Sequence, residues 1–128
     1  MSDTATARRT LIPGADHPIT VTPNTKHVVV TAGGKIIADT RNALTLQEAS
    51  YPAVQYIPRG DADVSALDRS DHHSWCPYKG EASYFSIPVI DRGENAIWTY
   101  EQPHEAVADI RDHLAFYPDR VTIEEHDD

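Results

Sequence analysis

The chain has 128 residues, of which 40% are hydrophobic and 24% charged, a composition typical of one soluble globular domain. Eleven basic and twenty acidic residues give a net charge of −9. This balance disfavours a nucleic-acid partner, because phosphate backbones are bound by clustered Lys and Arg. There is no run of about 18 apolar residues, so we expect no membrane span. The one cysteine cannot form an internal disulfide, which favours a cytoplasmic location.

In chain order, residues 1–16 lack a long apolar core, and we expect a flexible leader there rather than a signal peptide. The domain is expected over residues 17–124, followed by an acidic tail at 125–128. Short β-branched or alternating apolar runs predict strands at 27–32, 35–39, 44–48, 54–57, 82–87, 96–100 and 120–123. Gly33 and Gly34, between the first two runs, predict a hairpin turn.

One α-helix is expected after Pro103, which suits a first helical position. Val107, Ile110 and Leu114 then recur at spacings of three and four residues, the period of a helix. A short helical turn is expected at residues 63–67. Many short strands with one late helix predict a mainly β fold of antiparallel sheets.

Residues 71–80 (DHHSWCPYKG) concentrate chemically active side chains, and Pro77 and Gly80 predict an ordered loop there. Lys79, His72 or His73 could favour the thiolate of Cys76 and make it a nucleophile. The alternative is that Cys76 is a small buried hydrophobic residue, which is common for free cysteines.

Two predicted strands carry further candidate residues. Leu44, Leu46 and Glu48 share one strand face, so Glu48 either meets a cation or is shifted towards its neutral form. The alternative is that Glu48 ends the strand and reaches water. Trp98 and Tyr100 share a face of another strand, as core residues or as a ligand-binding wall.

Lys79 and Arg59 are the candidate cations of this sequence. They could form an anion site that holds a phosphate or carboxylate group of a small ligand. The alternative is a salt bridge between one of them and Glu48 or Glu81.

Five blocks of sequence carry a family resemblance. They are residues 37–44 (IADTRNAL) with Glu48, 51–59 (YPAVQYIPR), 76–87 (CPYKGEASYFSI), 96–100 (AIWTY) and 114–117 (LAFY). In this order and spacing, residues 17 to about 124 resemble the domain-of-unknown-function family 427, also classed as nucleotidyltransferase-like. Ile57 departs from the pattern, because the family commonly has an aromatic residue there. The resemblance implies a β-tent fold, in which two antiparallel sheets meet at an angle with a pocket between them.

Metal chemistry has little support in the sequence. The zinc knot of some β-tent relatives needs paired cysteines, whereas this chain has Cys76 alone. We therefore expect no metal. A mixed site of His72, His73 and Cys76 is a weaker alternative. Asp61 and Asp63 have the spacing of a nucleotidyltransferase magnesium pair, but they lead into the predicted helical turn. Helix capping is the simpler interpretation of Asp63.

We therefore expect a pocket lined by Cys76, Lys79, Tyr56, Trp98 and Tyr100, with Glu48 and Arg41 beneath it and Arg59 and His72 as further binding residues. Three functions fit this pattern. The first is a binding module for a small aromatic or anionic ligand, without a cofactor. The second is an enzyme in which Cys76 attacks the bound group or Lys79 polarises it. The third is a scaffold in which these residues only hold the sheets together.

Overall fold

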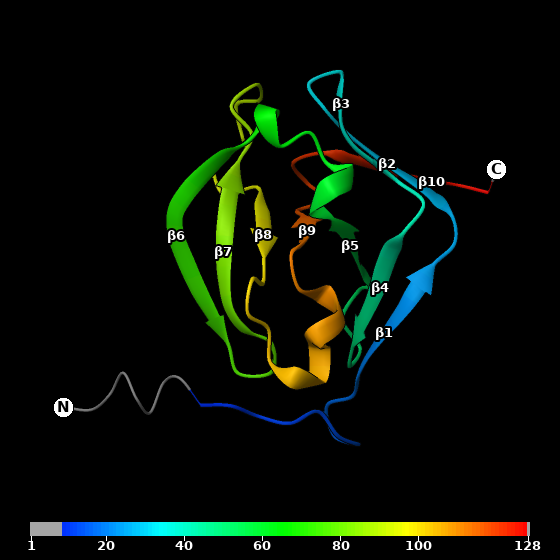
Figure 1. The fold of residues 1–128 in the computed structure, drawn as a ribbon, viewed down its shortest axis with the longest axis vertical. Helices are drawn as coiled ribbons and strands as arrows, with labels where there is room; N and C mark the ends of the chain where they lie inside the picture. Colours follow the sequence, from blue (N-terminus) through cyan, green and yellow to red (C-terminus); the bar gives the residue numbers. More distant parts are fainter. Residues whose placement is uncertain (1–8, 128) are drawn as a thin grey trace.

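The computed structural model describes residues 9–127, and within this range ten strands form two antiparallel sheets (Figure 1). The larger sheet has the strand order β1-β4-β5-β9-β8-β7-β6, and the smaller has the order β10-β2-β3. The strands are β1 (Ile19–Asn24), β2 (His27–Ala32), β3 (Lys35–Thr40), β4 (Ala43–Glu48), β5 (Val54–Pro58), β6 (Asp68–Cys76), β7 (Gly80–Ser86), β8 (Ile97–Thr99), β9 (His113–Phe116) and β10 (Thr122–His126). The mainly β class predicted from the sequence is confirmed.

The predicted hairpin turn between β2 and β3 is confirmed. Gly33 and Gly34 have φ values of 58° and 81°. A two-residue turn of this kind needs positive φ at both positions, which glycine adopts at little steric cost.

The larger sheet has a cluster of buried hydrophobic side chains on each of its two faces. Successive residues alternate between the faces, so Ile57, Ile97 and Leu114 pack with Val28 and Val30 of β2 in one cluster. Ala115 and Trp98, their neighbours in sequence, belong to a second cluster on the opposite face. The smaller sheet therefore covers one face of the larger sheet, and aromatic residues occupy the other.

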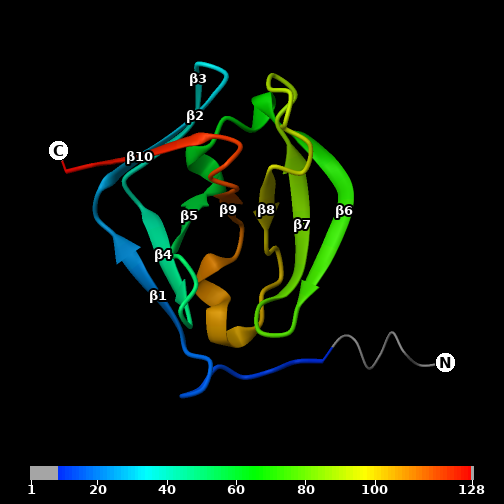
Figure 2. The same cartoon turned by 180° about the vertical axis from the view of Figure 1, so that it is seen from behind.

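The larger sheet is strongly curved. In both views β6 and β7 stand on one side of the molecule and β1 and β4 on the other, with β5, β8 and β9 between them (Figure 1 and Figure 2). Glu48, the last residue of β4, nevertheless forms an ion pair with Lys79, which immediately precedes β7. The curvature thus brings side chains from distant parts of the sheet into contact.

The predicted α-helix after Pro103 is wrong. Only a 3-10 helix, η3 (Glu105–Ile110), forms there, and Leu114 lies in strand β9. Val107 and Ile110 are both buried, because a spacing of three residues matches the three residues per turn of a 3-10 helix. Val107 has non-helical φ and ψ angles, and Asp112, at a φ of 56°, turns the chain into β9.

The predicted ordered loop at residues 71–80 is also wrong, because most of it belongs to β6. This strand lies at the edge of the larger sheet and carries mainly exposed polar side chains, so it lacks the alternation that reveals a half-buried strand. A register irregularity between Arg69 and His73 disturbs the pattern further. Only residues 77–79 form a turn.

The helical turn expected at residues 63–67 is present as η2 (Val64–Ala66), just after η1 (Arg59–Asp61). Residues 1–8 of the expected leader and residue 128 of the expected tail lie outside the described residues. Within the described part, β10 continues to His126 and therefore includes Glu125 and His126, which were assigned to the tail. Among residues 9–127, no helix has the length and apolar character needed to cross a membrane.

Candidate functional site

A pocket of about 650 Å³ lies mainly on the aromatic face of the larger sheet, and β10 of the smaller sheet contributes to its lining. Tyr56 of β5 and Trp98 of β8 contribute to it from the larger sheet, and Ile123 and Glu125 of β10 contribute from the smaller. Seven of the ten aromatic residues of the chain line this pocket: Tyr51, Tyr56, Tyr84, Trp98, Tyr100, Phe116 and Tyr117. The pocket thus gathers most of the aromatic residues of the protein.

Trp98 forms the centre of one wall. It pairs with Tyr84 on β7 and with Ala115 on β9. Because Ala115 has only a methyl side chain, the Trp98 indole reaches towards β5 and donates a hydrogen bond from Nε1 to the Tyr56 hydroxyl at 3.1 Å. The Tyr117 ring lies beside the indole, with ring centroids 4.6 Å apart.

Tyr56 and Tyr100 present neutral hydroxyl groups to the pocket. Burial raises the pKa of both phenols above the ordinary value of 10.0. Both side chains therefore stay protonated at neutral pH and can donate or accept a hydrogen bond.

Glu48 and Lys79 form the charged end of the pocket. The Lys79 Nζ donates to Glu48 Oε1, and His17 Nε2 lies 2.7 Å from Glu48 Oε2. Burial acts to raise the pKa of Glu48, but hydrogen bonds with Lys79 and His17 outweigh burial and lower it. Glu48 is thus an ionised carboxylate at neutral pH, and the sequence-based alternative that it meets a cation is confirmed.

The turn between β6 and β7 positions Lys79. Cys76 pairs with Gly80 across the hairpin, and the Lys79 N–H donates to the Cys76 carbonyl at 3.2 Å. Gly80 has a φ of 109°, which other residues rarely adopt. The Leu11 N–H donates to the carbonyl of Pro77, within this turn, at 2.9 Å, so the segment before β1 helps to hold the turn in place.

The thiol of Cys76 does not contribute to the pocket wall as expected. Cys76 is half-buried, packs against the aromatic cluster of Tyr56 and Tyr84, and is missing from the described residues that line the pocket. This position matches the alternative of a small, partly buried hydrophobic residue.

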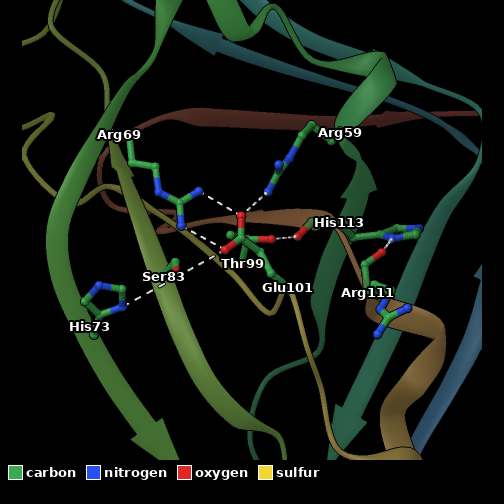
Figure 3. Close-up of polar contacts among 8 residues, drawn as sticks. All are labelled: Arg59, Arg69, His73, Ser83, Thr99, Glu101, Arg111 and His113. Carbon is green, nitrogen blue, oxygen red and sulfur yellow. Dashed lines mark hydrogen bonds and ion pairs between the residues drawn. The ribbon is translucent and has the colours of Figure 1, made fainter.

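Arg59 lies elsewhere, in a second polar cluster (Figure 3). Arg59 and Arg69 both point towards Glu101, with N···O distances of 3.1 Å from Arg59 and 2.7 and 2.8 Å from Arg69. Both guanidinium groups also lie 5.5 Å from the centre of the Phe85 ring. The hydrogen bonds from Arg69, followed by those from Arg59, lower the pKa of Glu101 to about 2. The expected anion site of Lys79 and Arg59 is not formed, because each cation pairs with a different carboxylate.

The comparison with known proteins identifies the family of this chain. A family model described as "Domain of unknown function (DUF427)" matches residues 20–127. The chain belongs to this family. No curated protein matches the chain.

Arg41 and His72, two expected binding residues of this DUF427 domain, are exposed and lie outside the described lining of the pocket. Arg41 follows β3, on the smaller sheet. His72 lies on the edge strand β6, where its ring centroid is 4.5 Å from that of Tyr84. The structure therefore brings together Glu48, Tyr56, Lys79, Trp98 and Tyr100, but neither Arg41 nor His72 joins them.

The two acids considered for nucleotidyl transfer in this DUF427 domain have separate partners. Asp61 accepts a hydrogen bond from Thr40 Oγ1 at 2.7 Å, whereas Asp63 accepts one from Ser65 Oγ and lies 3.7 Å from Lys35 Nζ. Both lie at 3-10 turns rather than on a strand. Across residues 9–127, no group of three or more His, Cys, Asp or Glu side chains has the arrangement of a metal site.

Several residues of the DUF427 pocket were missed from the sequence. Tyr84 alternates with Ala82 in a correctly predicted strand, so the period-two pattern could have placed it beside Trp98. Tyr51 and Tyr117 lie outside regular strands, and no periodic signal marks them. Glu101 likewise follows β8 without a motif, so its two arginine partners could not be inferred.

Proposed function

We propose that this DUF427 domain binds a small organic ligand in the pocket on the aromatic face of its larger sheet. The observation that carries the proposal is the gathering of seven of the ten aromatic residues around one pocket of about 650 Å³. Small-molecule sites are commonly about 300–1,000 Å³ and combine aromatic walls with a few polar groups.

The polar groups of the pocket suit an orienting role. The Glu48–Lys79 pair lies at one end, and the hydroxyl of Tyr56 and the indole N–H of Trp98 form a hydrogen bond on the wall. Trp98 is only half-buried, so its ring has a surface available for a ligand. A planar or branched apolar group would pack on the rings while its polar end contacts the ion pair.

Two finer assignments belong to this proposal. We assign the two sheets to the β-tent architecture that the family resemblance implies. We also place the protein in the cytoplasm, on the ground that its single cysteine gives no internal disulfide.

A thermal-shift screen against a metabolite library tests the proposal. A ligand at about 100 times its Kd should raise the melting temperature by roughly 10 °C, because it binds only the folded state. The rise should be lost in Trp98→Ala and reduced in Trp98→Phe, which keeps an aromatic ring.

Trp75→Phe is the matched control, because Trp75 lies on β6 outside the described lining of this pocket. It should respond to the ligand like the unmodified chain. Ligands that stabilise Trp98→Ala and the unmodified chain equally would contradict the proposal, and so would a library without any stabilising compound.

A further inference from the structure

The aromatic lining of the pocket suits one chemical class of ligand, organic cations. This inference rests on the ligand-binding function proposed above. Aromatic rings attract cations because the face of each ring carries partial negative charge. Two of the pocket's ring pairs meet at an angle: Trp98 and Tyr117 at 49°, and Tyr56 and Trp98 at 89° with centroids 6.3 Å apart. Tyr56 is almost fully buried, whereas Trp98 and Tyr117 are half-buried. The corner between the Trp98 and Tyr117 rings is therefore the part of this aromatic wall that a cation can reach.

The charges of the described lining residues agree with this chemistry. Lys79 is the one cationic side chain among them, and its charge is already balanced by Glu48. Glu125, on β10, is the remaining charged group of the described lining, and it accepts a hydrogen bond at 3.0 Å from the neutral Asn24 side chain. The lining thus carries a net negative charge, in a chain whose net charge is −9. Such a field favours entry of cations over anions.

Neither Arg120 nor Arg59 offers a free anion site. The guanidinium carbon of Arg120 lies 5.6 Å from the Tyr117 ring centre, and Arg120 Nε lies 3.9 Å from Asp119 Oδ1. The fold therefore already uses one of these rings to bind a cationic group. Arg59, the other candidate for an anion, is held by Glu101 in the second cluster.

We propose that the pocket binds an organic cation with an alkylated ammonium head group, which packs in the corner formed by Trp98 and Tyr117. An alkylated ammonium fits this site better than a primary amine, because its methyl groups contact the rings and it needs no hydrogen-bond acceptors. The pocket is much larger than such a head group alone, so the ligand also has an apolar or aromatic body.

A set of three compounds of matched shape tests the proposal. Choline carries a trimethylammonium head, 3,3-dimethyl-1-butanol is its neutral carbon counterpart, and 3,3-dimethylbutanoate carries a negative charge on a similar body. Binding is measured by the fluorescence of Trp98 in the Trp75→Phe variant, which leaves Trp98 as the only tryptophan. We expect choline to bind at least about tenfold more tightly than the neutral alcohol, and the anion to bind most weakly.

Substitutions of the corner residues distinguish a site that prefers cations from a site that binds any apolar ligand. Tyr117→Leu, read by the same Trp98 signal, should reduce the preference for choline over the alcohol at least about threefold, whereas Tyr78→Leu, outside the described lining, should leave it unchanged. Trp98→Phe, followed by the melting temperature, should retain part of the choline effect.

Equal binding of choline and the alcohol would overturn the cation proposal while leaving a small-ligand pocket in place. Tighter binding of the anion, or no response to choline up to high millimolar concentration, would overturn it as well. A failure of the broader ligand-binding function would instead appear as a negative result in the metabolite screen.

Discussion

At the scale of single residues, the site depends on the ionised pair of Glu48 and Lys79. Lys79 is buried, which is rare for a lysine without a partner. Its ammonium is stabilised because Glu48 accepts from it, while His17 holds the other carboxylate oxygen. Removing one member of such a pair leaves the other charge buried with fewer hydrogen bonds.

We therefore predict that Lys79→Met lowers the free energy of unfolding by about 1–3 kcal/mol, because Glu48 loses a charged donor. The same loss should raise the pKa of Glu48. Urea denaturation at neutral pH measures the first effect. Lys26→Met is the matched control, since Lys26 is exposed and its 3.3 Å ion pair with Asp127 is screened by water. Equal midpoints for the two variants would show that the Glu48–Lys79 pair does not stabilise the fold.

Glu101 makes the free energy of unfolding depend on pH in the acidic range. Its pKa is about 2 in the folded protein and 4.5 ordinarily, so the unfolded chain binds a proton first as the pH falls. The stabilisation from Arg69 and Arg59 is complete above pH 4.5 and is lost progressively as the pH falls towards 2. Because Glu101 is partly exposed, solvent screening limits the effect to about 1 kcal/mol.

We predict that Glu101→Gln flattens the fall in stability between pH 4.5 and pH 2, since the amide has no charge to lose. Chemical denaturation at a series of pH values measures the slope. Glu94→Gln, at an exposed position, should keep the slope of the unmodified chain. A slope unchanged by Glu101→Gln would contradict the role given to the two arginines.

At the scale of elements, the turn between β6 and β7 determines where Lys79 points. A side chain added at Gly80 would strain the backbone and place its Cβ 3.3 Å from His104 Cδ2 and 3.4 Å from the Gln102 carbonyl oxygen. We predict that Gly80→Ala costs about 1–3 kcal/mol of stability and weakens ligand binding. Denaturation and the melting-temperature shift measure the two effects.

Gly60→Ala is the control for this element, because Gly60 has no atom within 4 Å of an added Cβ and no positive φ. It should be neutral or slightly stabilising, through a smaller entropy of the unfolded chain. If Gly80→Ala were as stable as Gly60→Ala, the turn would not need the geometry described.

The same elements show what sequence patterns can and cannot predict. The strands with buried β-branched residues, such as β2, were found because alternation and a Gly-Gly turn are local signals. The strand β1 was missed because Pro23 and its polar residues hide the pattern of Ile19 and Val21. The 3-10 helix η3 was taken for an α-helix because Val107 and Ile110 fit both periods. The non-helical backbone of Val107 and Arg111 prevents a regular α-helix there.

At the scale of the whole molecule, the curvature of the larger sheet assembles the pocket. Five of the expected site residues meet in it because β4, β5, β7 and β8 bend around one space, and no local pattern encodes that bend. The sequence nevertheless predicted that Trp98, Tyr100 and Glu48 share a site. It could not predict that Arg59 would pair with Glu101, since that contact joins residues 42 positions apart.

The two tryptophans of the chain allow the most direct test of the central claim. Trp98 Nε1 donates to Tyr56 within the pocket, whereas Trp75 Nε1 donates to the Arg9 carbonyl at 3.1 Å, on the edge strand β6. Their indole N–H signals are separate reporters in a ¹H–¹⁵N correlation spectrum. Titration with a compound that raises the melting temperature should move the Trp98 signal and leave the Trp75 signal in place. Movement of the Trp75 signal alone would place the ligand elsewhere and contradict the account.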